Sequence, residues 1–168
     1  MNHVKDNPVG VDVLIQELQT KLYERLSFEN IEGFGRVYLD ERHDSIVPVH
    51  YAGNGEHTEV LIDDRYTLRY FFVENETTES QMTMSATEVD IIFLVNLEKA
   101  YPDIKHRADE EFKREIYRLF RKTRFFYLSK MTITKGKEAL EDFKHNLIDM
   151  QPYHFIRFRG EIKYQLDH

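Results

Sequence analysis

The segment Val89–Leu97 is the sequence feature that most constrains the fold. Apolar residues alternate along it at every odd position, and Ile92 and Leu94, which lie between them, are apolar as well. Alternation with a period of two predicts a β-strand. Apolar residues on both faces indicate that both faces of this strand are covered. We therefore expect Val89–Leu97 to be a central strand of a sheet.

A second strand and a polar connection precede this segment. Tyr66–Val73 alternates with aromatic and aliphatic residues on one face, which predicts a strand. Residues 74–88 are rich in Glu, Thr, Ser and Asn and contain no branched aliphatic residue. Tyr66–Leu97 is therefore expected to form a long β-hairpin in which residues 74–88 are an extended polar arm outside the core. The alternation slips between Ala86 and Val89, which predicts a bulge or a turn there.

Amphipathic helices are predicted on either side of this hairpin. Apolar residues at helical spacing favour a first helix over about residues 12–26, a second over about 104–121 and a shorter third over 137–147. Further short strands are expected at residues 34–39, 46–51, 58–62 and 125–128. The chain of 168 residues has the length of one domain. We predict a single α+β domain over residues 1–168, with a mixed, mainly antiparallel sheet, helices packed on that sheet, and a flexible N-terminus over residues 1–10.

The last segment, His154–Leu166, has the clearest alternation in the chain. One face is mostly apolar, whereas the other carries Arg157, Arg159 and Lys163 at alternate positions. A strand with this pattern has one face on a core and one face in water or on a polar partner. We therefore expect the charged face to be a functional surface that can be altered without loss of the fold.

The composition excludes several classes of function. The chain has no cysteine, which excludes disulfides, thiolate nucleophiles, iron–sulfur clusters and Cys-type zinc sites. A net charge of −7 argues against bulk nucleic-acid binding, and no direct sequence-specific nucleic-acid binding is expected. No stretch approaches the roughly 20 apolar residues of a membrane span, and the polar N-terminus lacks the apolar core of a signal peptide. We expect a protein made in a cytosol, with no membrane partner.

Two weak constellations keep an enzymatic interpretation open as an alternative. Glu161-Ile162-Lys163 resembles the carboxylate-x-lysine half of a nuclease metal site, for which Asp149 is the nearest upstream carboxylate. His50 and His57 flank a glycine turn and would be candidate metal ligands, with two glutamates nearby. No complete catalytic or phosphate-binding motif occurs, so we expect no enzyme, no metal and no cofactor. The alternatives are a cytosolic adaptor or ligand-binding domain and, second, a metal-dependent nuclease.

Charges of opposite sign are concentrated in different segments. Residues 105–124 are rich in cations, whereas Glu74, Glu76, Glu79 and Glu88 make the polar arm acidic. One basic and one acidic surface on the same chain suit a head-to-tail homo-oligomer. The candidate interface residues are Met82, Met84, Arg118, Arg121, Arg157, Arg159 and Lys163.

The order helix, long hairpin, helix and closing strand resembles the tail-terminator and tail-completion proteins of tailed bacteriophages. Val11–Leu26, Tyr66–Leu97, Ile104–Arg121 and Tyr153–Leu166 carry this resemblance, which covers most of the chain. It implies a structural subunit without catalytic residues that forms a homo-oligomeric ring between the tail tube and the head connector. The implied partners are further copies of the chain and other phage neck or tail proteins. The implied location is the virion, after synthesis in the host cytoplasm.

Overall fold

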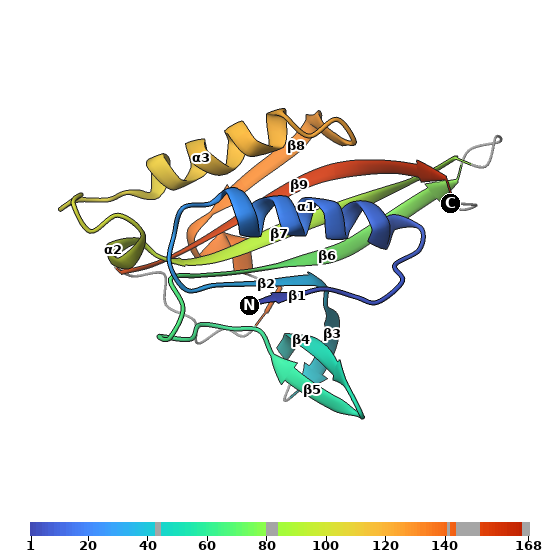
Figure 1. Ribbon diagram of the computed structural model, residues 1–168, viewed down its shortest axis with the longest axis horizontal. Helices are drawn as coiled ribbons and strands as arrows, with labels where there is room; N and C mark the ends of the chain where they lie inside the picture. Colours follow the sequence, from blue (N-terminus) through green and yellow to red (C-terminus); the bar gives the residue numbers. More distant parts are fainter. Residues whose placement is uncertain (43–44, 80–83, 141, 144–151, 166–168) are drawn as a thin grey trace.

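We describe residues 1–42, 45–79, 84–140, 142–143 and 152–165 of the computed structural model. They form the α+β fold that the sequence predicts, with a mixed, mainly antiparallel sheet of six strands in the order β1-β2-β6-β7-β9-β8. A second sheet has the order β3-β4-β5 and lies below the first in Figure 1. The strands are β1 (Asn2–His3), β2 (Ile31–Arg36), β3 (Tyr38–Arg42), β4 (Ser45–Gly53), β5 (Glu56–Glu59), β6 (Leu68–Glu79), β7 (Met84–Asn96), β8 (Phe126–Lys135) and β9 (Tyr153–Gln165).

Strand β7 lies at the centre of the large sheet, which confirms the prediction for Val89–Leu97. It is antiparallel to β6 on one side and to β9 on the other, and all 13 of its residues pair with β9. Val89, Ile91 and Phe93 belong to the core on one face of the sheet, whereas Ile92 and Leu94 belong to the core on the other. Both faces of the strand are therefore covered.

Helices α1 (Val11–Arg25) and α3 (Asp109–Arg121) cover one face of the large sheet (Figure 1). Phe93 is in edge-to-face contact with Phe112 of α3 and Phe158 of β9, with 5.7 Å between ring centroids in each pair. Phe120 lies 5.2 Å from Phe158. Each such side chain contributes about 1.5–3 kcal/mol when it is buried. Ring packing between α3 and the sheet thus fixes the helix, and with it the direction of its polar face.

The opposite face of the large sheet has a core of its own. Phe71 of β6 packs against Phe143 with 6.2 Å between ring centroids, close to the 3₁₀ helix η1 (Gly136–Leu140). Val60, which follows the small sheet, joins the same core. The large sheet is therefore sandwiched between helices on one side and a smaller mixed layer on the other.

Some element boundaries differ from the sequence predictions. The helix expected over residues 104–121 begins at Asp109, and a separate short helix, α2 (Leu97–Ala100), comes before it. Three acidic residues fill the first turn of α3, where they interact favourably with the helix dipole and so favour the later start. The helix expected over 137–147 is a 3₁₀ helix at Gly136–Leu140, and residues 144–151 lie outside the described residues.

The strand expected over residues 34–39 is in fact two strands in two different sheets. β2 ends at Arg36 and β3 begins at Tyr38, and the N–H of Val37 between them donates to the carbonyl of Phe72. The third expected strand forms earlier, at Glu56–Glu59, where it pairs with β4. β8 extends to Lys135, well beyond the predicted Leu128, because Thr132 to Lys135 also pair with β9.

The predicted bulge lies on the partner strand and not on β7. The ladder between β7 and β9 is continuous, whereas β6 shifts register between Glu74 and Thr77. Ser85 and Thr87 are buried and continue the inward-facing alternation of β7. The hydroxyl of Thr87 hydrogen-bonds with Thr77 at 2.9 Å and Tyr164 at 3.2 Å. Two buried polar residues on the inward face, Ser85 and Thr87, therefore account for the apparent slip in the alternation of the sequence.

Residues 1–3 are held by the large sheet, although the sequence predicts a flexible N-terminus over residues 1–10. Asn2 and His3 form β1 and pair in parallel with Gly33 and Phe34 of β2. The terminal ammonium group donates to the carbonyl of Ile31 at 2.7 Å. A two-residue strand has no periodic pattern, so the sequence could not reveal it.

Gly160 is predicted to be intolerant of any side chain. A Cβ atom at this position would lie 2.3 Å from Cζ of Phe126 and 2.7 Å from two further ring atoms. We expect Gly160→Ala to lower the free energy of unfolding by about 1–3 kcal/mol, because Phe126 is itself held by the core. Urea unfolding followed by circular dichroism measures this change. Adding Phe126→Leu should restore part of the loss, and a strictly additive double variant would contradict the steric explanation.

Candidate functional site

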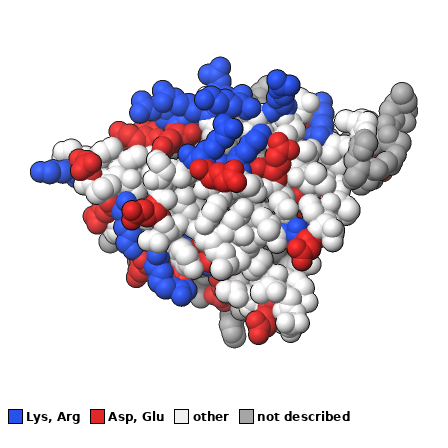
Figure 2. All heavy atoms as spheres, in the orientation of Figure 1, with Lys and Arg blue, Asp and Glu red and all other residues white. Residues whose placement is uncertain are grey.

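The outward face of α3 and the residues after it form a basic stripe, defined as Arg114, Arg118, Arg121, Lys122 and Arg124. All five side chains are exposed, and none forms an ion pair with any residue that the structure describes. Figure 2 shows Lys and Arg gathered along the top of the molecule, over α3. The stripe faces outward because Phe112, Ile116 and Phe120, at helical spacing, are fully buried. Arg118 and Arg121, two of the predicted interface residues, are thus available to a partner.

Two tyrosines and one lysine extend the basic stripe. Tyr117 is exposed on α3, and the guanidinium of Arg121 lies 5.9 Å from its ring centroid. Tyr127 is exposed at the start of β8, with the ammonium group of Lys163 at 4.8 Å from its ring centroid. Lys163 is one of the predicted interface residues, and Tyr127 lies in the 125–128 segment, part of which the sequence also offers as apolar contact area, whereas Tyr117 is not predicted. Exposed tyrosines are a signal for an interface, but the sequence cannot distinguish them from buried ones.

The polar arm is extended, as predicted, but only one of its two strands lies outside the core. Every residue from Glu74 to Glu79 of β6 is exposed. On β7, by contrast, Ser85 and Thr87 are buried. Arg36 binds Glu74, and Nε of Arg159 lies 3.5 Å from Glu88. Glu76 and Glu79 form no ion pair with any described residue, so they are the acidic groups of the arm that remain free to meet a partner.

Of the two methionines predicted for the interface, only Met84 can be placed. It begins β7 opposite Gln165 of β9 and is partly buried. Met82 lies outside the described residues.

The exposed stretch Glu74–Glu79 of β6, called the acidic arm below, lies at one edge of the large sheet, and α3, which carries the basic stripe, lies beside β8 at the other edge. Pairing of β2 with β6 ends at Arg36 and Phe72, so the outer edge of residues 75–79 faces the β1–β2 side without a partner strand in the described part of the chain. β8 is the last strand at the other edge, and α3 lies beside it (Figure 1). The charges that the sequence separates along the chain are therefore separated in space as well.

Arg157 and Arg159 do not form the exposed charged face that the sequence analysis expects. Asp90 is only 1% exposed and accepts hydrogen bonds from Arg159 at 2.7 and 2.9 Å. The buried Arg157 has its Nε 3.4 Å from Asp90 and its guanidinium over the ring of Phe143. The hydrogen bond with Asp90 raises the pKa of Arg159. The expectation is wrong for Arg157 because the second core covers this part of the sheet, whereas Arg159 is half-exposed.

Reversing both arginines should therefore disrupt the fold. Arg157→Glu with Arg159→Glu would leave the buried carboxylate of Asp90 beside two further acids and without a cation. Breaking one buried pair already destabilises a protein by about 3–5 kcal/mol. We expect the double variant to lose its cooperative thermal unfolding transition, measured by circular dichroism. Lys163→Glu is the control, since its exposed side chain should tolerate reversal with no change in the transition.

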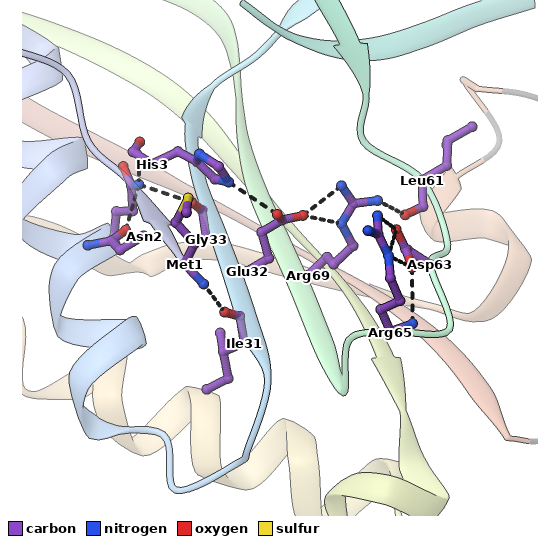
Figure 3. Close-up of polar contacts among 11 residues, drawn as sticks. Met1, Asn2, His3, Ile31, Glu32, Gly33, Leu61, Asp63, Arg65 and Arg69 are labelled. Carbon is purple, nitrogen blue, oxygen red and sulfur yellow. Dashed lines mark hydrogen bonds and ion pairs between the residues drawn. The ribbon is translucent and has the colours of Figure 1, made fainter. Parts of the chain in front are cut away.

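A polar cluster, defined as His3, Glu32, His50 and Arg69, joins the two sheets. Figure 3 shows His3, Glu32 and Arg69 in one line from β1 across β2 to β6. His3 Nε2 lies 3.2 Å from Glu32, and Arg69 donates to the other Glu32 oxygen at 2.8 Å and to the carbonyl of Leu61 at 2.6 Å. The His50 ring, from β4, lies 4.9 Å from those of His3 and Phe34. These contacts hold the small sheet against the large one.

The chemistry of the polar cluster fits a structural role. Burial by itself raises the pKa of Glu32, but the contacts with His3, Arg69 and Tyr66 lower it overall, so the carboxylate is charged. His57, the other predicted metal ligand, lies with Tyr51 and Tyr38 and not with His50. No group of three His, Asp or Glu side chains among the described residues is arranged to hold a metal ion. Asp149, required by the nuclease alternative, lies outside those residues.

A groove of about 530 Å³ lies beside the polar cluster. His3, Tyr38 and Tyr51 contribute to its walls, and Asp12 and Arg36 lie on its charged side. Arg36 donates to both oxygens of Asp12, at 2.6 and 2.8 Å. Burial raises the pKa of Asp12, but hydrogen bonds from Arg36 and Lys5 outweigh it and lower the pKa. The principal charges of the groove thus neutralise one another within the chain.

Comparisons with known proteins assign no family to this chain. No protein-family model matches it, and no curated protein matches it significantly. Among the described residues, no helix has the length and apolar character needed to cross a membrane.

Acid should loosen the contact between the two sheets through His50. Burial, together with the nearby His3, lowers the pKa of His50 below 6.5, so the native state prefers the neutral ring, although Glu32 opposes this effect. The stabilising contribution is complete above pH 6.5 and is lost as the pH falls through the lowered pKa. We expect the free energy of unfolding to fall more steeply below pH 6.5 in the wild type than in His50→Gln.

Urea titrations at a series of pH values measure this difference. His57→Gln is the matched control, because His57 is exposed and lies outside the polar cluster. Equal pH profiles for the wild type and His50→Gln would contradict the prediction.

Proposed function

We propose that this chain is a structural subunit that assembles head to tail into a homo-oligomeric ring in the neck or tail of a tailed bacteriophage. One observation carries the ring: the acidic arm lies at one edge of the large sheet, and α3 with its basic stripe lies beside the strand at the other edge. Contacts between two different surfaces of identical subunits close into a ring when the rotation between neighbours permits. The order of the elements, which resembles that of tail-terminator and tail-completion proteins, supports the location in a phage.

The exposed side chains indicate which groups would orient such a contact and which would give it affinity. Each exposed ion pair contributes only about 0–1 kcal/mol, so Glu76 and Glu79 against Arg118 and Arg121 would set orientation and encounter. Apolar and aromatic area must supply the affinity, at about 25 cal/mol per Å² buried. On the basic side, Tyr117 and Tyr127 are exposed aromatic residues of the described part of the chain. The function proposed for the chain is therefore geometric: each copy offers two different surfaces to two neighbours and catalyses nothing.

The groove favours a second candidate, a ligand-binding domain. Its volume of about 530 Å³ lies within the range of small-molecule sites, about 300–1,000 Å³. Against this candidate, the cations Arg36 and Lys5 are already paired with Asp12. A ligand would therefore have to displace contacts that the chain has already made.

Charge reversal on each edge tests the ring. Arg118→Glu with Arg121→Glu should lower the assembled fraction at least tenfold at low ionic strength, because both cations would become repulsive toward the arm. Glu76→Lys with Glu79→Lys should do the same. Mixing the two reversed proteins should restore contacts between unlike copies, since the charges are then complementary again. Mass photometry and negative-stain imaging, each over a range of salt concentrations, provide the measurements.

The control reverses two exposed cations away from the basic stripe, Arg25→Glu with Lys105→Glu. This variant has the same change in net charge as Arg118→Glu with Arg121→Glu, and it should assemble as the wild type does. A wild-type chain that stays monomeric at every concentration and salt would contradict the ring itself. Unchanged assembly of both reversed variants would contradict the contact between arm and stripe.

A further inference from the structure

The strand register brings the free part of β6 and the beginning of β8 to the same level of the large sheet. Thr77 of β6 pairs with Thr87, which pairs with Ile162, which pairs with Phe126 of β8. In the next row across the sheet, Glu88 of β7 pairs with Glu161 of β9, and Glu161 pairs with Tyr127 of β8. The two bulged residues of β6, 75 and 76, lie opposite Glu88 in this row. The outer edge of β6 and the outer edge of β8 therefore lie at the same height on opposite sides of the four strands β6-β7-β9-β8.

Neither edge has a partner strand in the described part of the chain. β8 closes the strand order of the large sheet, so its outer edge is free. The outer edge of β6 is free from residue 75 because pairing with β2 ends at Phe72. An unpaired edge presents a row of backbone N–H and C=O groups that can pair with another strand. The described part of the chain therefore has two strand edges whose backbone groups are free to pair with another strand.

The strand directions also match. β6, β7, β9 and β8 are antiparallel in succession, so β6 and β8 run in opposite directions within one copy. Rotation about an axis parallel to the strands keeps strand directions unchanged. In a ring with such an axis, β8 of one copy would meet β6 of the next in the antiparallel sense, at the same height. Antiparallel pairing is the more stable arrangement per residue.

Side-chain charges beside the two edges are complementary. Arg124 precedes β8, and Lys163 lies over Tyr127 at the same end of the sheet. Glu76 and Glu79 lie on the exposed stretch of β6. Cations on one edge and acids on the other favour pairing of unlike edges over pairing of two identical edges.

We propose that neighbouring copies join through a backbone β-ladder, in which the beginning of β8 of one copy pairs antiparallel with the free edge of the β6 arm of the next. This inference rests on the proposed ring and specifies its contact. The large sheet would then continue from subunit to subunit around the ring. The ladder sets the register, and the basic stripe and acidic arm select the correct edges.

Disulfide cross-linking tests the ladder directly, because the chain has no cysteine of its own. Residues opposite each other in an antiparallel ladder have Cα atoms about 4.5–5.5 Å apart, which suits a disulfide. Glu76→Cys with Tyr127→Cys places one thiol on each edge in the same row, and both side chains are exposed. Within one copy, three strand spacings of about 4.8 Å separate the edges by roughly 14 Å, too far for an internal disulfide. Oxidation of the assembled protein should give covalent dimers, trimers and larger species that reductant reverses.

The matched control is Glu56→Cys with Tyr127→Cys, since Glu56 is exposed on β5 of the small sheet and away from the arm. It should give no ladder of covalent species. Hydrogen exchange on the unmodified chain gives a second, mutation-free measurement. Those amides of residues 76–79 and 126–127 that point away from β7 and β9 should exchange at least tenfold more slowly in the assembled protein than in the dilute monomer.

The outcomes separate this inference from the function on which it rests. Rings that form without specific cross-links and without added protection at these amides would overturn the ladder and leave the ring with a different contact. A chain that never assembles would overturn both. Specific cross-links together with slowed exchange at both edges would support the ladder.

Discussion

Burial of β7 on both of its faces is the constraint on which the rest of the structure depends. A strand with Ile91 and Phe93 on one side and Ile92 and Leu94 on the other needs an apolar layer on each side. Helices α1 and α3 supply one layer, while η1, Phe143 and residues around the small sheet supply the other. Because α3 must turn Phe112 and Phe120 toward Phe93, its cations have to point outward. The basic stripe is thus a consequence of core packing.

Charged residues inside the molecule are paired, and this pairing determines which charges remain for partners. Asp90 binds Arg157 and Arg159, Glu32 binds Arg69, and the half-buried Arg36 binds Asp12 and Glu74. Removing one member of a buried pair would leave an uncompensated charge in a low-dielectric environment, which is strongly destabilising. These pairs therefore hold the layers together and are unavailable to partners. Among the described residues, Glu76 and Glu79 on β6 and the basic stripe on α3 are unpaired charges that lie at separate places on the surface.

A sheet whose two edges differ in charge favours contacts between unlike edges of neighbouring copies. Such contacts suit head-to-tail assembly. Two identical edges would favour a closed dimer, whereas unlike edges favour an open series of contacts that a suitable rotation closes into a ring. The bulge at Glu74–Thr77 marks the place where β6 leaves the cover of β2. Beyond that place the arm is charged and exposed. Exposed charge on an edge strand discourages indiscriminate pairing and leaves only a complementary edge as a partner.

The sequence by itself determined the α+β class, the central position of Val89–Leu97, the long hairpin and the inward stripe of α3, because periodicity reports which residues face a core. It also identified Arg118 and Arg121 as exposed cations, since helical spacing separates them from the buried residues. The tertiary structure alone decided the places of β1, the small sheet and Arg157. A two-residue strand has no period, and a chain that changes sheets at Val37 gives no local signal of the change. The alternation around Arg157 shows only that it shares a face with other charges, whereas the cover supplied by Asp90, Asp142 and Phe143 comes from residues distant in the sequence.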